Sequence, residues 1–262
     1  MSKTLFAALG VSFAYDGAVV LDGIDLSLHA GLFYGIVGPN GCGKTTLLDL
    51  LVGCKKPRTG TISYKSQRLD AYGKRDLARE LALVPQEFDT GFGFTVEEIV
   101  MMGRHPHIDR FASPSTADWQ AVDNALSAIG IGELRHRYTD TLSGGQKQRT
   151  VVARALAQDT PVILFDEATA SLDIKYTLQI FNLARSLVRN EGRTVIAVIH
   201  NLSLAAAYCD QLIFMKDGRL CRQGPTPSTM TAETIAEVFG VESQVTRDPF
   251  NQALQVSYHY GE

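Results

Sequence analysis

Two adjacent carboxylates, Asp166 and Glu167, follow an apolar run that begins at Val162. Such a run predicts a buried strand whose carboxyl end carries both groups, where a metal ligand and a general base can act side by side. Upstream, a Ser-Gly-Gly turn at residues 143–145 opens a helical pattern. A helix start with bare glycine N–H groups is an anion site, because its first amides lack internal partners. The stretch 141–173 thus carries an anion site and a hydrolytic centre that point in different directions. The two can act on one substrate only if two copies of the chain meet head to tail.

A glycine-rich loop, GPNGCGKTT, runs from Gly38 to Thr46 between an apolar run and a helical segment. This order is required of a phosphate-binding loop, since glycines let backbone N–H groups curl around an anion. Lys44 can reach the β- and γ-phosphates, and the Thr45 hydroxyl can join a Mg²⁺ shell. The pattern arises by chance in roughly one chain in a hundred of this length. Cys42, inside the loop, is interpreted as inert packing with mild oxidant sensitivity.

The composition bounds the class of protein. The 262-residue chain is 45% hydrophobic and 20% charged, which is typical of a packed protein. A net charge of −3 argues against a nucleic-acid partner. No apolar run approaches the ~18 residues of a membrane helix, and the opening residues are interpreted as a strand rather than a signal peptide. The four cysteines lack metal-site spacing and are interpreted as reduced thiols.

Apolar patterning predicts strands that alternate with helices. The predicted strands cover residues 5–15 and 19–29 (an antiparallel pair), 33–37, 60–64, 81–85, 162–167, 194–200 and 211–216. Helices are predicted after the glycine loop, throughout 95–159, and over 175–191, 201–209 and 231–240, with a weak strand pair in 244–258. The alternation predicts an α/β fold with a mainly parallel sheet and helices on both faces.

Two helix starts carry a capping-box pattern. Thr95 is followed by Glu98 at the third helical position, and Ser115 is followed in the same way by Asp118. In the second of these helices the apolar residues fall on one face that includes Trp119, so this tryptophan is expected in the core.

Together these motifs resemble the nucleotide-binding subunit of an ATP-binding-cassette (ABC) transporter over roughly residues 4–240. The matching motifs are the phosphate loop (Gly38 to Thr45), the Q-loop glutamine (Gln86), the LSGGQ signature (Leu142 to Gln146), the second acidic motif (Val162 to Asp166), the catalytic glutamate (Glu167), the D-loop (Ser171 to Asp173) and the switch histidine (His200). Tyr15 stands where the family stacks an aromatic ring on adenine. Ala168 replaces the usual proline, which should change local stiffness more than chemistry.

The resemblance implies a P-loop cassette with a mainly parallel core sheet, an N-terminal antiparallel β subdomain and an inserted α-helical subdomain. Residues 1–86 and 160–240 would form the core with the β subdomain. Residues 87–159 would form the helical subdomain that carries the signature, and residues 241–262 a C-terminal edge extension.

The resemblance also implies an ATPase with ATP and Mg²⁺ as cofactors and a site shared by two copies of the chain. The residues implied in catalysis are Glu167, His200, Lys44 and Gln86. Those implied in nucleotide binding are Tyr15, Gly38, Pro39, Asn40, Gly41, Cys42, Gly43, Lys44, Thr45, Thr46, Ser143, Gly144, Gly145, Gln146 and Asp173. Those implied at the metal are Thr45, Gln86 and Asp166. In the family's mechanism ATP closes the dimer as the power stroke, and hydrolysis resets it.

Several of these side chains also have a purely structural interpretation. His200 can be a sheet-end histidine, Asp173 can cap the following helix, and Tyr15 can be a packing residue. His105 and His107 have no third ligand nearby and are interpreted as solvated loop residues.

Three stretches resemble the importer subfamily for iron-siderophore, haem and cobalamin complexes. They are GRHPHIDRF (residues 103–111), the run from 200 to 220, and TAETIAEVFGV (231–241). The chain reads His-Asn-Leu-Ser at 200–203, where that subfamily commonly has His-Asp-Leu-Asn. There are two alternatives, a soluble ABC ATPase and an exporter subunit. Soluble ABC ATPases usually carry tandem cassettes or basic surfaces, whereas exporter subunits share every ATP motif with importer subunits.

The importer interpretation implies an ATP-hydrolysing subunit on the cytoplasmic face of the cell membrane, which powers uptake of a metal chelate. Its partners would be two copies of a membrane permease, a second copy of itself and, indirectly, a substrate-binding protein. The segment 87–104 should receive the permease, because Phe88, Phe92 and Phe94 lie on a glycine-rich loop and apolar loop residues often mark interfaces. Alternatively, these aromatics fill the seam between two subdomains.

Overall fold

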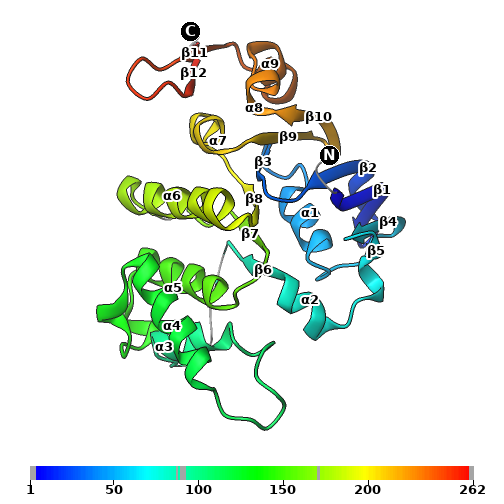
Figure 1. The fold of residues 1–262 in the computed structure, drawn as a ribbon. Helices are drawn as coiled ribbons and strands as arrows, with labels where there is room; N and C mark the ends of the chain where they lie inside the picture. The colour runs from blue at the N-terminus through cyan, green and yellow to red at the C-terminus, as the bar shows by residue number, and fades with distance from the viewer. Residues whose placement is uncertain (1–3, 87, 89–92, 170–171, 260–262) are drawn as a thin grey trace. The chain divides into compact units, whose positions relative to one another are not determined.

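The structure is a computed structural model that describes residues 4–86, 88, 93–169 and 172–259. The chain forms two compact units. The first combines Met1–Tyr72 with Thr194–Glu262, and the second is Gly73–Arg193. Figure 1 labels the elements of both units along the chain.

The first unit contains two sheets and a C-terminal hairpin. Its strands are β1 (Thr4–Tyr15), β2 (Ala18–His29), β3 (Phe33–Val37), β4 (Thr59–Tyr64), β5 (Gln67–Arg68), β8 (Thr194–Val198), β9 (Gln211–Lys216), β10 (Arg219–Pro225), β11 (Ser243–Arg247) and β12 (Leu254–Tyr258). Its helices are α1 (Lys44–Leu51), α7 (Leu202–Tyr208), α8 (Thr226–Thr229) and α9 (Ala232–Phe239), with a 3₁₀ turn at Leu69–Ala71. One sheet has the antiparallel order β2-β1-β4-β5. In the other, β9, β3 and β8 are parallel neighbours and β10 is antiparallel to β9.

Strands β3 and β8 are buried along their whole length, as their continuous apolar sequences predict. They pair in parallel with Ile36 opposite Val198. The carboxyl ends of both strands therefore meet at one edge of the sheet, where ligands of open α/β sheets bind. The glycine loop follows β3 at this edge, and His200 follows β8.

The second unit combines a parallel strand pair with a group of helices. Its elements are α2 (Lys74–Glu80), β6 (Leu81–Val84), α3 (Val96–Met102), α4 (Thr116–Ile129), α5 (Gly144–Ala157), β7 (Val162–Asp166) and α6 (Ile174–Glu191), with 3₁₀ turns at Gly132–Leu134 and Thr139–Thr141. Strands β6 and β7 pair in parallel with Val84 opposite Phe165. Helices α3, α4 and α5 pack on one another (the green helices of Figure 1).

Both predicted capping boxes are present. The Thr95 hydroxyl accepts the Glu98 N–H at 3.4 Å, and the Glu98 carboxylate accepts the Thr95 N–H at 2.7 Å. Ser115 and Asp118 make the same reciprocal pair at 3.3 and 2.9 Å. These local signals therefore place the starts of α3 and α4 correctly.

The prediction that Trp119 belongs to the core is wrong. Its side chain is 39% exposed, whereas Val122, Leu126 and Ile129 on the same helix are buried. The guanidinium of Arg135 lies 5.8 Å from the centre of the indole ring. Because the indole ring is large and Trp119 lies in the first turn of its helix, part of the ring stays in water. The Arg135 cation then packs against the ring through a cation–π contact.

Candidate functional site

The glycine loop between β3 and α1 is tightly shaped by its neighbours. A Cβ at Gly38 would collide with the carbonyl oxygen of Met215, and one at Gly43 would lie 2.6 Å from the Leu21 side chain. Gly43 also has φ +97°, a conformation that glycine adopts at little cost. Glycine is required at both positions, and α1 starts directly after the second with its first amides at the loop.

Lys44 is 5% exposed and lies over the same loop. Its ammonium donates hydrogen bonds to the carbonyl oxygens of Gly38 at 3.0 Å and Pro39 at 2.8 Å. A buried cation held by carbonyl groups at a helix start is an electrostatic site for a phosphate. Cys42 is buried nearby, and this burial raises the pKa of its thiol, which agrees with its interpretation as inert packing.

Tyr15 ends β1 and keeps 44% of its surface exposed. One side of its ring meets Phe13 edge-on, with 4.9 Å between ring centres. The ammonium of Lys55 lies 5.4 Å from the Tyr15 ring centre, and a hydrogen bond to Asp49 raises the pKa of Lys55. Lys55 belongs to no recognisable sequence motif, and only the fold brings it beside the tyrosine.

His200 is exposed at the carboxyl end of β8. The preceding Ile199 N–H donates to the Ile36 carbonyl on β3 at 3.1 Å, which ties this strand end to the strand of the glycine loop. The following Asn201 caps α7 by accepting the Leu204 N–H at 3.0 Å. The first unit therefore places the predicted switch histidine and the predicted phosphate loop on neighbouring strand ends.

The second unit brings together the other two predicted catalytic side chains. Strand β7 ends at Asp166, which is 6% exposed, and Glu167 follows with φ +50°. The Gln86 amide, two residues beyond the end of β6, donates to the Glu167 carboxylate at 2.9 Å. A non-glycine residue with positive φ stores strain, and such strain clusters at functional sites.

The signature motif forms the start of α5. The Ser143 hydroxyl accepts the Gln146 N–H at 3.4 Å, and the Gln146 side chain accepts the Ser143 N–H at 3.0 Å. A Cβ at Gly144 would meet nothing within 4 Å, so the first turn has an open approach to its backbone. An uncrowded helix start without an acidic residue in its first turn is suited to an anion.

Asp173 caps α6 by accepting the Tyr176 N–H at 3.0 Å, so its structural interpretation is confirmed. In the D-loop, Ser171 lies outside the described residues.

Tyr176 has a second neighbour that sequence reasoning missed. The guanidinium of Arg149, on α5, lies 3.9 Å from the Tyr176 ring centre, and Arg149 is 7% exposed. The signature helix and the helix after the acidic strand are thus joined by a buried cation–π contact.

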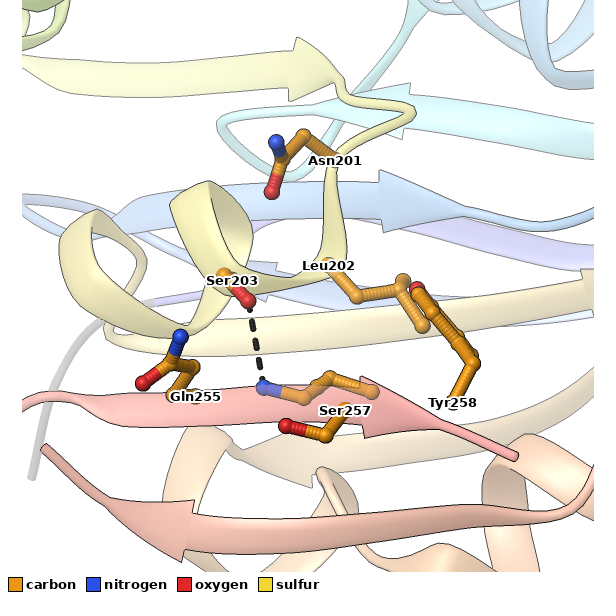
Figure 2. Close-up of a pocket in the computed structure, with 7 residues that line it drawn as sticks. Asn201, Leu202, Ser203, Gln255, Ser257 and Tyr258 are labelled. Carbon is orange, nitrogen blue, oxygen red and sulfur yellow. Dashed lines mark hydrogen bonds between the residues drawn. The ribbon is translucent and has the colours of Figure 1, made fainter. Parts of the chain in front are cut away.

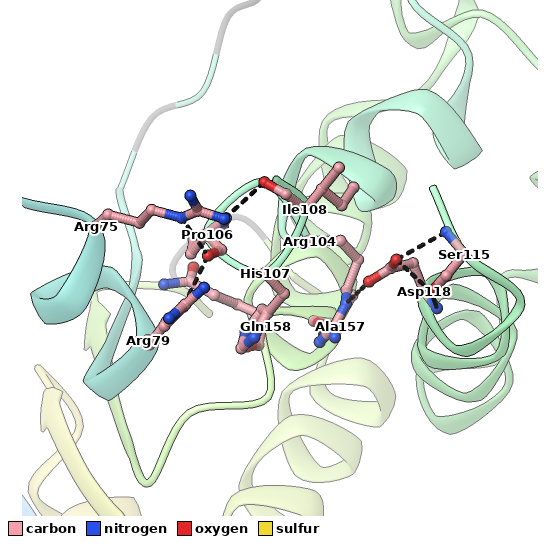
Figure 3. Close-up of polar contacts among 10 residues, drawn as sticks. All are labelled: Arg75, Arg79, Arg104, Pro106, His107, Ile108, Ser115, Asp118, Ala157 and Gln158. Carbon is pink, nitrogen blue, oxygen red and sulfur yellow. Dashed lines mark hydrogen bonds and ion pairs between the residues drawn. The ribbon is translucent and has the colours of Figure 1, made fainter. Parts of the chain in front are cut away.

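The segment after α3 is held in place by arginines (Figure 3). Arg75 and Arg79 of α2 both donate to the Pro106 carbonyl, at 2.9 and 2.8 Å. His107 lies 2.8 Å from the Gln158 carbonyl through its Nε2 atom, so it is engaged by the protein rather than solvated. The subfamily-like stretch 103–111 is thereby fixed to α2 and to the end of α5.

The aromatic residues predicted to contact a permease are described in part. Phe88 is half-buried, and the Arg154 guanidinium lies 4.5 Å from its ring centre. Burial lowers the pKa of Arg154. Phe94 is half-buried, and Phe92 lies outside the described residues.

The fold is of the α/β class. Its first unit carries a glycine loop with a buried lysine, its second unit carries strand-end carboxylates, and each is a feature typical of nucleotide hydrolases. None of the helices in the described part of the chain combines the length and apolar character needed to cross a bilayer.

Comparison with known proteins identifies the family. The sequence model described as ABC transporter matches residues 21–170. The cobalamin import ATP-binding protein BtuD of Halobacterium salinarum is 40% identical over 248 residues, which are 95% of this chain and 62% of the relative. The siderophore transport system ATP-binding protein YusV of Bacillus subtilis is 36% identical, over 95% of this chain and 90% of the relative. The hemin import ATP-binding protein HmuV of Rhodopseudomonas palustris is 38% identical, over 94% of both.

Solved structures agree with this family. One described as an inward-facing ABC transporter of the metal-chelate type has a TM-score of 0.84 and 28% identity, over 98% of both chains. A dimeric ATP-binding cassette in a post-hydrolysis state, bound to ADP and Pi, has a TM-score of 0.75 and 26% identity, over 85% of this chain and 99% of the other. The chain belongs to the ABC transporter family. The predicted fold class and the predicted resemblance to importer subunits for siderophores, haem and cobalamin are confirmed.

Proposed function

We propose that the chain is the ATP-hydrolysing subunit of a membrane importer for a metal chelate. The catalytic part of this proposal rests on the hydrogen bond of 2.9 Å from the Gln86 amide to the Glu167 carboxylate. It joins a strand-end carboxylate to the amide of the neighbouring strand end, so the carboxylate is already oriented before substrate arrives. Metal-chelate uptake is inferred from the relatives, whose names give cobalamin, siderophore and hemin transport.

The reaction is attack of water on the γ-phosphorus of ATP, which releases ADP and phosphate. Glu167 accepts the proton of the attacking water, and Gln86 holds the carboxylate in line. Lys44, now bound to two loop carbonyls, turns to the β- and γ-phosphates and stabilises their charge. His200 holds the γ-phosphate, and the exposed ring of Tyr15 stacks on adenine.

The donor set predicted for Mg²⁺ fits this ion. The Thr45 hydroxyl, the Asp166 carboxylate and the Gln86 amide oxygen are hard oxygen ligands. Among the described residues no group of three or more His, Cys, Asp or Glu side chains forms a metal cage. Mg²⁺ commonly relies on one or two protein oxygens together with substrate phosphates, so no such cage is needed. When bound, it would neutralise phosphate charge.

A second copy of the chain completes the site in this proposal. The glycine loop, residues 38–46, binds ATP from one side, and residues 143–146 at the open start of α5 bind the γ-phosphate from the partner. The Ser143 hydroxyl accepts the Gln146 N–H and keeps its own proton to donate to an anion. Asp173 serves the dimer in addition to capping α6. Closure on ATP is the power stroke.

The remaining roles follow from the same proposal. The segment 87–104 receives a permease subunit, and the dimer works on the cytoplasmic face of the membrane with two permease copies and, indirectly, a substrate-binding protein. The predicted family subdomains, with a core of 1–86 and 160–240, a helical insertion of 87–159 and an extension of 241–262, stay a prediction.

The catalytic role is tested with Glu167→Gln. Because glutamine keeps the shape but cannot accept a proton, ATP hydrolysis should fall by roughly 10²–10⁴-fold while ATP binding persists. Size-exclusion chromatography with ATP should show the variant accumulating as a dimer. Glu133→Gln, at an exposed position, is the control and should keep normal turnover. Normal turnover of the Glu167 variant would refute the general-base role.

The importer role is tested by purifying the tagged chain from gently solubilised membranes. A co-purifying polytopic permease that takes up a metal chelate supports the proposal. A permease that exports its substrate, or recovery with ribosomes or repair factors, would replace the importer with one of the alternatives and leave the ATPase chemistry intact.

A further inference from the structure

The last two described strands pack against the helix that follows His200. β11 and β12 form an antiparallel hairpin, residues 243–258, called here the C-terminal hairpin. β12 contacts α7, and the Val256 N–H donates to the Ser203 hydroxyl at 3.1 Å. Figure 2 shows Ser203 directed at the β12 backbone, with Leu202 and Tyr258 facing each other at one end of the pocket between the two elements.

This contact engages the outer edge of β12 at Val256, the one buried residue of the strand. Val256 pairs with Val245 of β11 on one side, and its N–H meets Ser203 on the other. Val256 is also buried, at 7% exposure. An uncovered strand edge would leave such groups to solvent, and a lone two-stranded hairpin is marginally stable in water. The hairpin is therefore stabilised by α7, which contacts β12, together with α9, which contacts β11.

Helix α7 is in turn stabilised by the C-terminal hairpin. α7 has seven residues, and a helix so short is not stable without tertiary contacts. Leu202 and Ala205 are buried on its inner side, where α7 contacts β3, and Ser203 holds its outer side. α7 is thus fixed between the core sheet and the C-terminal hairpin.

His200 lies at the amino end of this fixed helix. One end of its loop is tied to β3 by the Ile199–Ile36 hydrogen bond, and the other end is tied to α7 by the Asn201 cap. From this arrangement we infer that the C-terminal hairpin is a positioning element for His200, acting through the Ser203–Val256 contact. The inference rests on the proposed function, in which His200 holds the γ-phosphate.

The test uses the full-length chain and compares Ser203→Ala with Ser203→Thr, which keeps the hydroxyl. Gln244→Ala, at an exposed position on β11, is the control. Hydrogen exchange should accelerate severalfold at residues 199–205 in the alanine variant and stay unchanged in the core strand β9. ATPase kcat should fall by roughly three- to tenfold with the KM for ATP within twofold, because misplacing a catalytic group costs rate at full occupancy. The threonine and Gln244 variants should resemble the native chain.

A double-mutant cycle separates positioning from general stability. If the hairpin acts through His200, Ser203→Ala should cost no further activity in a His200→Ala background. Unchanged exchange at 199–205, or the same fold loss of kcat in both backgrounds, would overturn the inference. A native chain without ATPase activity would instead refute the proposed function, and the exchange data would still report whether the hairpin fixes the loop.

Discussion

The ion pair at the start of α4 allows a stability prediction with a worked magnitude. Asp118 accepts hydrogen bonds from the Ser115 hydroxyl at 2.6 Å, the Ser115 N–H at 2.9 Å and the Arg104 guanidinium at 2.9 Å. The Ser115 hydroxyl, followed by the Ser115 N–H and Arg104, lowers the pKa of Asp118 from 3.8 to about 2. Because a tenfold change in an acid dissociation constant corresponds to about 1.4 kcal/mol, this lowering of the pKa corresponds to about 2.5 kcal/mol. Solvent screening reduces the stabilisation of the fold by the charged carboxylate to about 1–2 kcal/mol.

The sign of the pH dependence follows from the lowered pKa. The stabilisation is complete above the unfolded value near pH 4 and is lost as the pH falls through 2. Asp118→Asn removes the charge but keeps the shape, so it should reduce the free energy of unfolding by about 1–2 kcal/mol at pH 7. The difference from the native chain should shrink to about half of that at pH 3.

The assay is urea unfolding of both chains between pH 7 and pH 3. Comparing the two at each pH cancels the titration of every other group. Asp123→Asn is the matched control, since Asp123 pairs with Arg135 at an exposed position and should contribute less than about 1 kcal/mol. A difference for Asp118→Asn that is equally large at pH 7 and pH 3 would refute the electrostatic reasoning and point to packing instead.

Three further predictions concern the predicted site residues and their neighbours. Gly38→Ala should abolish nucleotide binding in equilibrium dialysis, because its Cβ would collide with the Met215 carbonyl and lie 2.9 Å from the Cys42 sulfur; full binding by this variant would contradict the steric argument. Because burial raises its pKa, Cys42 should react with iodoacetamide at pH 8 far more slowly in the folded chain than in urea, as peptide mass spectrometry can measure. Arg149→Lys keeps the charge but loses the planar stack on Tyr176, so urea unfolding should show a loss of about 1 kcal/mol, and Tyr176→Phe a smaller one.

Short-range signals account for the parts of the fold that the sequence predicts well. The glycine loop is recognisable because its strand, loop and helix are contiguous, and the two capping boxes because each spans four residues. Helix α2 escapes sequence reasoning because none of its residues is buried, so it has no apolar period to detect. Its role depends on Arg75 and Arg79, whose carbonyl partners lie far along the chain.

The pairing of Gln86 with Glu167 shows where sequence reasoning about the site ends. Each residue lies two positions beyond a register pair, Val84 opposite Phe165, so parallel pairing of β6 with β7 brings them level. The sequence marks both strands but does not state that they are neighbours. It also gives no sign that Glu167 has φ +50°, since glutamate rarely adopts that conformation. In a regular strand, consecutive side chains point to opposite faces. The left-handed conformation of Glu167 breaks this alternation after Asp166, so the Glu167 carboxylate meets the Gln86 amide at 2.9 Å. Backbone strain of this kind is typical of positions that serve chemistry rather than stability.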